Sequence, residues 1–176
     1  FLGDEPVQSL GIGAYTLALA DVDGDGDLDA VMAFSAGTGN QVWLNDGTGR
    51  FSDSGQRLYD RPTYAVALGD LDGDGDLDAF FGHGGEVGEP NTVWLNNGSG
   101  ALTDSNQRLG DEGTMVVRLG DLDGDGDLDA FVGNSEADTV WINNANAPLA
   151  HDDTFTVPEG SRNNQLDVLA NDTDAD

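Results

Sequence analysis

Three nine-residue acidic segments limit what this chain can fold into more than any other feature. They read DVDGDGDLD at 21–29 and DLDGDGDLD at 70–78 and 121–129. Each has Asp at positions 1, 3, 5, 7 and 9 and Gly at positions 4 and 6. Carboxylates this close together repel one another unless a cation neutralises them. Calcium takes about six to eight oxygen ligands, which Asp-rich loops with Gly at a sharp bend supply, so each segment predicts a calcium-binding loop.

The prediction is three Ca²⁺ sites, and the candidate metal residues are all the aspartates of the three loops. They are Asp21, Asp23, Asp25, Asp27, Asp29, Asp70, Asp72, Asp74, Asp76, Asp78, Asp121, Asp123, Asp125, Asp127 and Asp129. Magnesium is a weaker rival, because it prefers fewer protein ligands and retains water. Solvated acidic turns without metal are the other alternative, but three copies with the same spacing are too regular for a simple run of charge.

An EF-hand does not explain the loops. That motif needs a bidentate Glu at loop position 12 and helices on both sides. Position 12 is Met32, Phe81 or Val132 here, and none of these side chains offers an oxygen ligand.

The acidic loops belong to a longer internal repeat. They start at residues 21, 70 and 121, so the repeats are 49 and 51 residues long. Two other motifs recur in step with them: VWLNDGTG at 42–49, VWLNNGSG at 93–100 and VWINNANA at 140–147; and FSDSGQRLYD at 51–60 with LTDSNQRLGD at 102–111. The opening FLGDEPVQSLG resembles a degenerate copy of the second motif, so the chain enters in mid-repeat.

Each repeat predicts four short strands and no helix. The first predicted strand is an apolar, β-prone run before the loop, the second is a similar run after it, and the third centres on the Val-Trp pair. The FSDSGQRL-type motif is the fourth predicted strand. The first three kinds of run are Tyr15–Ala20, Ala30–Phe34, Val42–Leu44, Tyr64–Gly69, Ala79–Gly82, Val93–Leu95, Met115–Gly120, Ala130–Gly133 and Val140–Ile142. Four short strands in about 50 residues are typical of a β-propeller blade. The predicted fold is all-β, with three blades of four short antiparallel strands, forming an open arc or part of a larger propeller.

Composition narrows the classes of partner. The chain has 34 acidic and 6 basic residues, a formal net charge of −28 and no cysteine. Nucleic acid is not an expected partner, because phosphate binding needs a basic surface, and no stretch is apolar enough to predict insertion into a membrane. Without cysteines no disulfide stabilises the fold, which leaves that role to metal ions.

The loops and the strands around them resemble FG-GAP or VCBS-type repeats, the calcium-binding blades of integrin-α-like propellers. The D-x-D-G-D-G-x-x-D loop followed by an apolar strand carries the resemblance, in register with Trp43, Trp94 and Trp141. The resemblance implies that side chains at loop positions 1, 3, 5 and 9 and the carbonyl at position 7 bind calcium. The carboxylates of Asp27, Asp76 and Asp127 are then expected to face solvent or a water in the shell. Residues 1–146 are predicted to hold the three repeats.

Residues 147–176 are predicted to be a separate short β tail. Their Asp-Asp-x-Phe-x-Val pattern at 152–157 and LDVLAND at 166–172 resemble the opening of bacterial cadherin-like or Ig-like domains found beside VCBS repeats. Such a domain needs about seven strands, so the tail alone cannot form its core. Truncation of a longer protein is one interpretation; addition of a tail strand to a neighbouring molecule, building a head-to-tail filament, is the other.

The functional prediction is a non-enzymatic, calcium-stabilised structural or adhesion module, secreted or on the cell surface. Its expected partners are copies of itself or other cell-surface proteins. A lectin-like module that binds glycans and an accessory domain of a larger secreted enzyme are the alternatives. His83 is interpreted as a loop histidine without a catalytic role, and the three tryptophans as packing residues of the blades.

Overall fold

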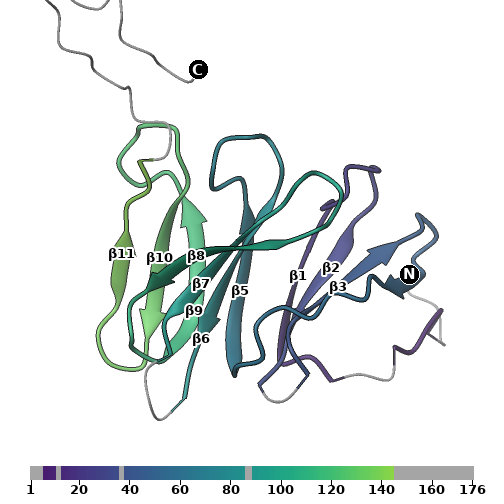
Figure 1. The fold of residues 1–176 in the computed structure, drawn as a ribbon, viewed down its shortest axis with the longest axis horizontal. Coiled ribbons are helices and arrows are strands. Elements are labelled where there is room, and N and C mark those ends of the chain that lie inside the picture. The colour runs from purple at the N-terminus through teal and green to yellow at the C-terminus, as the bar shows by residue number, and fades with distance from the viewer. Residues whose placement is uncertain (1–5, 11–12, 36–37, 86–88, 145–176) are drawn as a thin grey trace, which may run out of the picture.

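The computed structural model describes residues 6–10, 13–35, 38–85 and 89–144, and within these ranges it is all-β (Figure 1). Three separate antiparallel sheets stand side by side, and none closes into a barrel. This confirms the predicted all-β fold with open, propeller-like blades. In the described part of the chain no helix is long and apolar enough to cross a membrane.

Each sheet corresponds to one repeat. Blade 1 contains β1 (Thr16–Ala20), β2 (Asp29–Ala33), β3 (Gln41–Asn45) and β4 (Phe51–Asp53). Blade 2 contains β5 (Thr63–Gly69), β6 (Asp78–His83), β7 (Asn91–Leu95) and β8 (Thr103–Leu109). Blade 3 contains β9 (Thr114–Gly120), β10 (Asp129–Asn134) and β11 (Thr139–Trp141). Sequence order equals spatial order in every blade, so consecutive strands pair as hairpins.

The acidic loop is the hairpin between the first two strands of each blade. Ala20 pairs with Asp29, Gly69 with Asp78 and Gly120 with Asp129 in the antiparallel registers. The aspartate at loop position 9 is therefore the first residue of the second strand, one residue earlier than the apolar run predicts. This register holds the two ends of each loop together.

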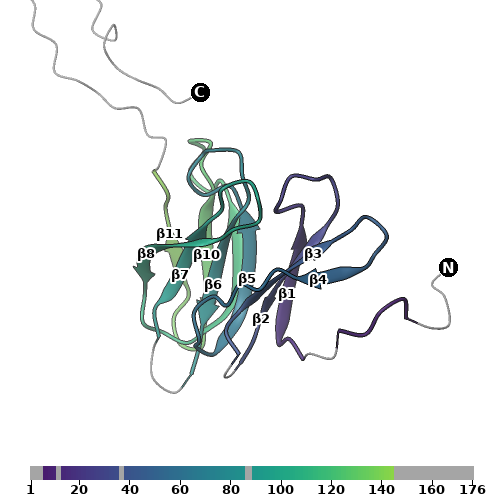
Figure 2. The same ribbon diagram turned by 45° about the vertical axis from the view of Figure 1, so that its right-hand side comes forward.

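The apolar cores lie between the blades. Val31 and Val42 of blade 1 pack with Ala79 and Phe81 of blade 2. The same positions, one repeat later, form the core between blades 2 and 3, which contains Phe80, Val93, Ala130 and Val132. Both faces of β6 are buried because residues alternate between two neighbouring blades. Figure 2 shows blade 1 set at an angle to blades 2 and 3. The most extensive contacts between neighbouring blades are those of β1 with β5 and of β5 with β9, the first strands of the three blades.

The tryptophans are packing residues, as predicted. Trp43 lies against a cluster of Ala30, Met32 and Phe34 on the outer side of blade 1. Trp94 packs against the core between blades 1 and 2, and Trp141 against the core between blades 2 and 3.

Two glutamines, Gln8 and Gln56, each bond to the backbone near the turn between the third and fourth strands of the following blade. Gln8 Nε2 donates to the carbonyl of Phe51 and Gln8 Oε1 accepts the Phe51 N–H, both at 2.8 Å. Gln56 Oε1 accepts the N–H of Leu102 at 2.9 Å, and Gln56 Nε2 donates to the carbonyl of Gly100 at 2.6 Å. Gln8 thus acts as Gln56 does one repeat later, which agrees with the opening segment being a degenerate repeat copy.

The interpretation of His83 as a loop residue is wrong. It is the last residue of β6 and is fully buried. Its Nδ1 lies 3.0 Å from Thr63 Oγ1 and its Nε2 lies 2.9 Å from Thr92 Oγ1, so both ring nitrogens have hydroxyl partners. The Gly-rich segment after it suggested a loop, but pairing with Thr63 extends the strand. Burial lowers the pKa of His83 to about 4, and the positive charge of Arg108 adds to this effect.

We predict that acidification from about pH 7 to about pH 5 destabilises the protein by about 2 kcal/mol through His83. The pKa is about 4 in the folded state and about 6.5 in an unfolded chain, so the unfolded state takes up the proton first as the pH falls. Urea unfolding of the wild type and of H83Q at both pH values measures the effect, because Gln does not titrate. The same pH dependence in both proteins would contradict it.

Candidate metal centres

The backbone of each loop folds around its first aspartate. Asp21 Oδ1 accepts the N–H of Gly24 at 2.8 Å and that of Asp25 at 3.1 Å, and Asp21 Oδ2 accepts the N–H of Gly26 at 2.9 Å. Gly24 and Gly26 have φ angles of +75° and +95°, which side chains with a Cβ rarely adopt. Loops 2 and 3 repeat these bonds from Gly to Asp70 and Asp121.

The last aspartate of each loop joins three parts of its blade. Asp78 Oδ2 accepts the N–H of Leu71 in the loop at 2.9 Å, and Asp78 Oδ1 accepts the N–H of Asn96 after β7 at 2.8 Å. Asp29 and Asp129 make the same pair of bonds in blades 1 and 3. All three side chains are fully buried. Each carboxylate oxygen keeps a second lone pair that can bind a cation.

The structure brings together three of the five aspartates of each loop. Carboxylate oxygens from positions 1, 3 and 9 lie within 4.8 Å of one another in every loop. The groups are Asp21, Asp23 and Asp29; Asp70, Asp72 and Asp78; and Asp121, Asp123 and Asp129. Oxygens bound to one calcium ion at about 2.4 Å are at most about 4.8 Å apart, so the donor type and the spacing both fit calcium.

Among the described residues, no cationic side chain forms a salt bridge with these triads. The salt bridges among the described residues are Arg57–Asp53, Arg61–Glu89 and Arg108–Asp104, and none of them involves a loop aspartate. Partial burial raises the pKa of Asp23, and the negative charge of Asp29 raises it further. Burial raises the pKa of Asp72 and of Asp123 in the same way. Each triad is thus a place where bound positive charge is favourable.

The pKa of the position 9 carboxylate shifts in opposite directions in blade 2 and in blade 3. Burial raises the pKa of Asp78 despite the two backbone N–H groups that bond to it. At Asp129 those N–H bonds, from Asn143 and Leu122, prevail and lower the pKa. Blade 2 is packed between two neighbours, so desolvation costs more there.

Position 5 aspartates lie outside the triads. The carboxylate of Asp25 accepts the N–H of Asp27 at 2.9 Å, and Asp74 and Asp125 make the same bond to Asp76 and Asp127. They are exposed at the mouth of each loop.

The position 7 carboxylates are less exposed than side chains that simply face solvent, and the expected water in the metal shell stays a prediction. Asp127 is only 7% exposed. A Cβ atom added to Gly98 would lie 2.7 Å from a carboxylate oxygen of Asp76, so there is no room for a side chain there. A Cβ atom added to Gly47 would meet the carboxylate of Asp27 in the same way. These carboxylates thus pack on the turn after the third strand, which explains why that turn carries Gly in repeats 1 and 2.

The asparagine that follows the third strand was not among the predicted site residues. Besides its N–H bond to position 9, Asn96 donates from Nδ2 to the carbonyl of Val22 in the loop of blade 1 at 2.7 Å. Asn143 donates in the same way to Leu71 in the loop of blade 2 at 2.7 Å. Each of these asparagines therefore connects the loop of its own blade to the loop of the preceding one. The recurrence of Asn after Val-Trp-Leu or Val-Trp-Ile in all three repeats was the available signal.

Comparison with protein families places these features in a known group. The FG-GAP-like repeat family matches residues 21–81 and 82–132, which together make up more than half of the chain. The chain belongs to the FG-GAP-like repeat family. The two matches include all three acidic loops and end before the tail. A search of curated proteins found no match to this chain.

We predict different effects for D78N and D74N in blade 2. An amide at position 78 offers one acceptor oxygen for two N–H donors, so one buried N–H loses its bond, which costs about 1–3 kcal/mol with or without calcium. An amide at position 74 still accepts the Asp76 N–H, so D74N loses stability only when calcium is present, where it removes the position 5 ligand that the FG-GAP resemblance implies. Urea unfolding in calcium and in EGTA measures both. Full stability of D78N in EGTA would contradict the structural role of Asp78.

Proposed function

We propose that this chain is a calcium-stabilised structural module of an extracellular protein, acting in adhesion or assembly rather than catalysis. The observation that carries the proposal is the triad of aspartates that has no cationic partner among the described residues and is present in all three blades of an FG-GAP-like array. Calcium bound there would supply the positive charge that the described side chains do not. The FG-GAP repeat supports an extracellular location. Because the chain has no cysteine, metal ions would take the stabilising role that disulfides often have in extracellular proteins.

Calcium binding would stabilise each blade where its loop meets its sheet. The first aspartate closes the loop, and the last ties it to β2, β6 or β10 and to the Asn after the third strand. A dissociation constant of about 10 μM at about 1 mM calcium gives about 2.7 kcal/mol for each site. Three such sites add about 8 kcal/mol, which is comparable with the total stability of a domain. Folding would then depend on an environment with millimolar calcium.

We predict that EGTA lowers the melting temperature by more than about 10 °C, because about 8 kcal/mol is lost from a chain of this size. Thermal unfolding followed by circular dichroism in calcium and in EGTA measures the shift. Returning calcium should restore the melt, whereas magnesium at the same concentration should restore it only in part. A melting temperature that EGTA leaves unchanged would refute the proposed role of calcium.

The assembly part of the proposal rests on the outer face of blade 3. Phe131 and Val140 there are 45% and 50% exposed. Their equivalents in blade 2, Phe80 and Val93, are 1% and 5% exposed because blade 3 covers them. An apolar blade face of this kind favours a further blade as its cover, either from a longer chain or from a second copy stacked head to tail.

Two finer assignments belong to this proposal. We propose that the part of the tail resembling a VCBS-associated cadherin-like domain continues into, or pairs with, neighbouring modules; it lies outside the described residues. The lectin-like alternative has less support, because Trp43, Trp94 and Trp141 pack against the blade cores and are not set out for stacking on sugars.

We predict that the chain self-associates in millimolar calcium and that V140E abolishes this. The added charge would be buried at the contact between copies, where an unpaired charge is strongly unfavourable. Sedimentation velocity over a wide concentration range measures the association. The control is M115E, which adds the same charge at a position that is 68% exposed and unpaired at the register shift of β9. A wild-type protein that stays monomeric at every concentration would rule out the head-to-tail contact.

A further inference from the structure

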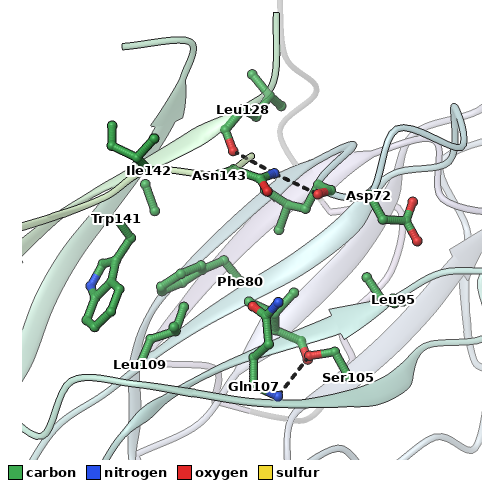
Figure 3. Close-up of a pocket in the computed structure, with 13 residues that line it drawn as sticks. Asp72, Phe80, Leu95, Ser105, Gln107, Leu109, Leu128, Trp141, Ile142 and Asn143 are labelled. Atoms are coloured by element: carbon green, nitrogen blue, oxygen red, sulfur yellow. Dashed lines mark hydrogen bonds between the residues drawn. The ribbon is translucent and has the colours of Figure 1, made fainter. Parts of the chain in front are cut away.

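An open groove of about 290 Å³ lies between blades 2 and 3 (Figure 3). Phe80 and Leu95 of blade 2 and Trp141 of blade 3 form apolar parts of its wall, and Gln107 stands at its edge. The last described strand, β11, ends at this groove, because Ile142 and Asn143 also line it. The groove therefore lies where the described chain stops.

The corresponding positions in the other two cores are filled by one side chain each. Leu102, in the hairpin between β7 and β8, is 7% exposed and belongs to the core between blades 1 and 2. Phe51, the first residue of β4, packs on the cluster of blade 1. In both cases the N–H of the inserted residue donates to the Oε1 of a glutamine from the preceding repeat, Gln56 or Gln8. One residue and one glutamine thus complete each of these two cores.

The walls of the groove match the surroundings of Leu102 position by position. Val31, Val42, Leu44 and Leu58 contribute to the core that contains Leu102. Their equivalents one repeat later all line the groove: Phe80, Val93, Leu95 and Leu109. The core between blades 2 and 3 contains no described residue from a hairpin after β11. It corresponds to the core that contains Leu102, but no described residue occupies the position of Leu102.

Two polar groups at the groove are left without partners among the described residues. The side-chain amide of Gln107 makes no hydrogen bond within this part of the chain and is exposed, whereas the equivalent Gln56 is half-buried and bonded. The indole Nε1 of Trp141 is buried and has no acceptor there. Trp43 and Trp94 both donate to an acceptor, Gln41 and Thr92. Buried donors without a partner are costly, so an occupant with backbone carbonyls is favoured.

The sequence places one residue at the required distance. Phe51 and Leu102 are each six residues after the asparagine that bonds to loop position 9, Asn45 and Asn96. Six residues after Asn143 comes Leu149. We propose that Leu149 occupies the groove between blades 2 and 3 and donates its backbone N–H to Oε1 of Gln107.

The residue types just before Leu149 differ from those just before Leu102. Gly100 has a φ of +71°, and Ala147, at the same place before Pro148, does not favour that conformation. The bond that Gln56 makes to the carbonyl of Gly100 is therefore not carried over to Ala147. The proposal moves the end of the third repeat from residue 146 to Leu149, so that the tail begins after the core is complete.

The test is solution NMR on the full 176-residue chain in millimolar calcium. The proposal predicts nuclear Overhauser contacts from the Leu149 methyls to the rings of Phe80 and Trp141, and slow exchange of the Leu149 amide. In Q107A that exchange should become about tenfold faster, since one hydrogen bond contributes about that factor. Q56A is the matched comparison, and it should accelerate exchange at Leu102 without changing Leu149.

Three outcomes would overturn the proposal. The first is rapid exchange at Leu149 in the wild type with no contact to either ring. The second is contact from another tail leucine, such as Leu166 or Leu169, in place of Leu149. The third is contact that appears only between differently labelled molecules in a mixed sample, which would make a second copy the occupant. Q107A leaves the apolar groove intact, so its effect on the Leu149 amide can be read without loss of the fold.

Discussion

The carboxylate at position 9 of each acidic loop connects the loop to the rest of its blade. It is fully buried, and its two oxygens accept N–H groups from the start of the loop and from the residue after the third strand. A buried carboxylate is stable only when hydrogen bonds or cations compensate for its lost hydration. The two N–H bonds provide part of that compensation. The nearby carboxylates at positions 1 and 3 add negative charge, which makes a bound cation favourable.

The same carboxylate also helps to connect one blade to the next through an asparagine. The asparagine that bonds to it, Asn96 in blade 2, donates its side-chain amide to the loop of the preceding blade. Gln8 and Gln56 each hold the backbone near the turn between the third and fourth strands of the following blade. The blades are thus joined by directed polar contacts as well as by apolar packing, which sets their spacing within the array. Ordering of one loop by metal would reach the neighbouring blade through these contacts.

The periodicity of the sequence predicted most of the fold, because the loops, the Val-Trp pairs and the turns recur in one register. Strand ends differed by a residue or two, since Asp78 and His83 pair within β6 although their residue types do not favour strands. The burial of His83 could not be predicted, because its partners Thr63 and Thr92 come from two other strands. The packing of Asp76 on Gly98 was hidden for the same reason: both depend on contacts between segments distant in sequence.

The central claim is that the aspartate triads bind calcium, and calorimetric titration of calcium into chelator-treated protein tests it most directly. The account predicts saturable binding of three ions per chain, one for each triad. It also predicts that the triple variant D23N, D72N and D123N loses that binding and unfolds in calcium at the temperature at which the wild type unfolds in EGTA, because in the described part of the chain these three side chains accept hydrogen bonds only within their own loops. Absence of saturable calcium binding by the wild-type protein would contradict the account.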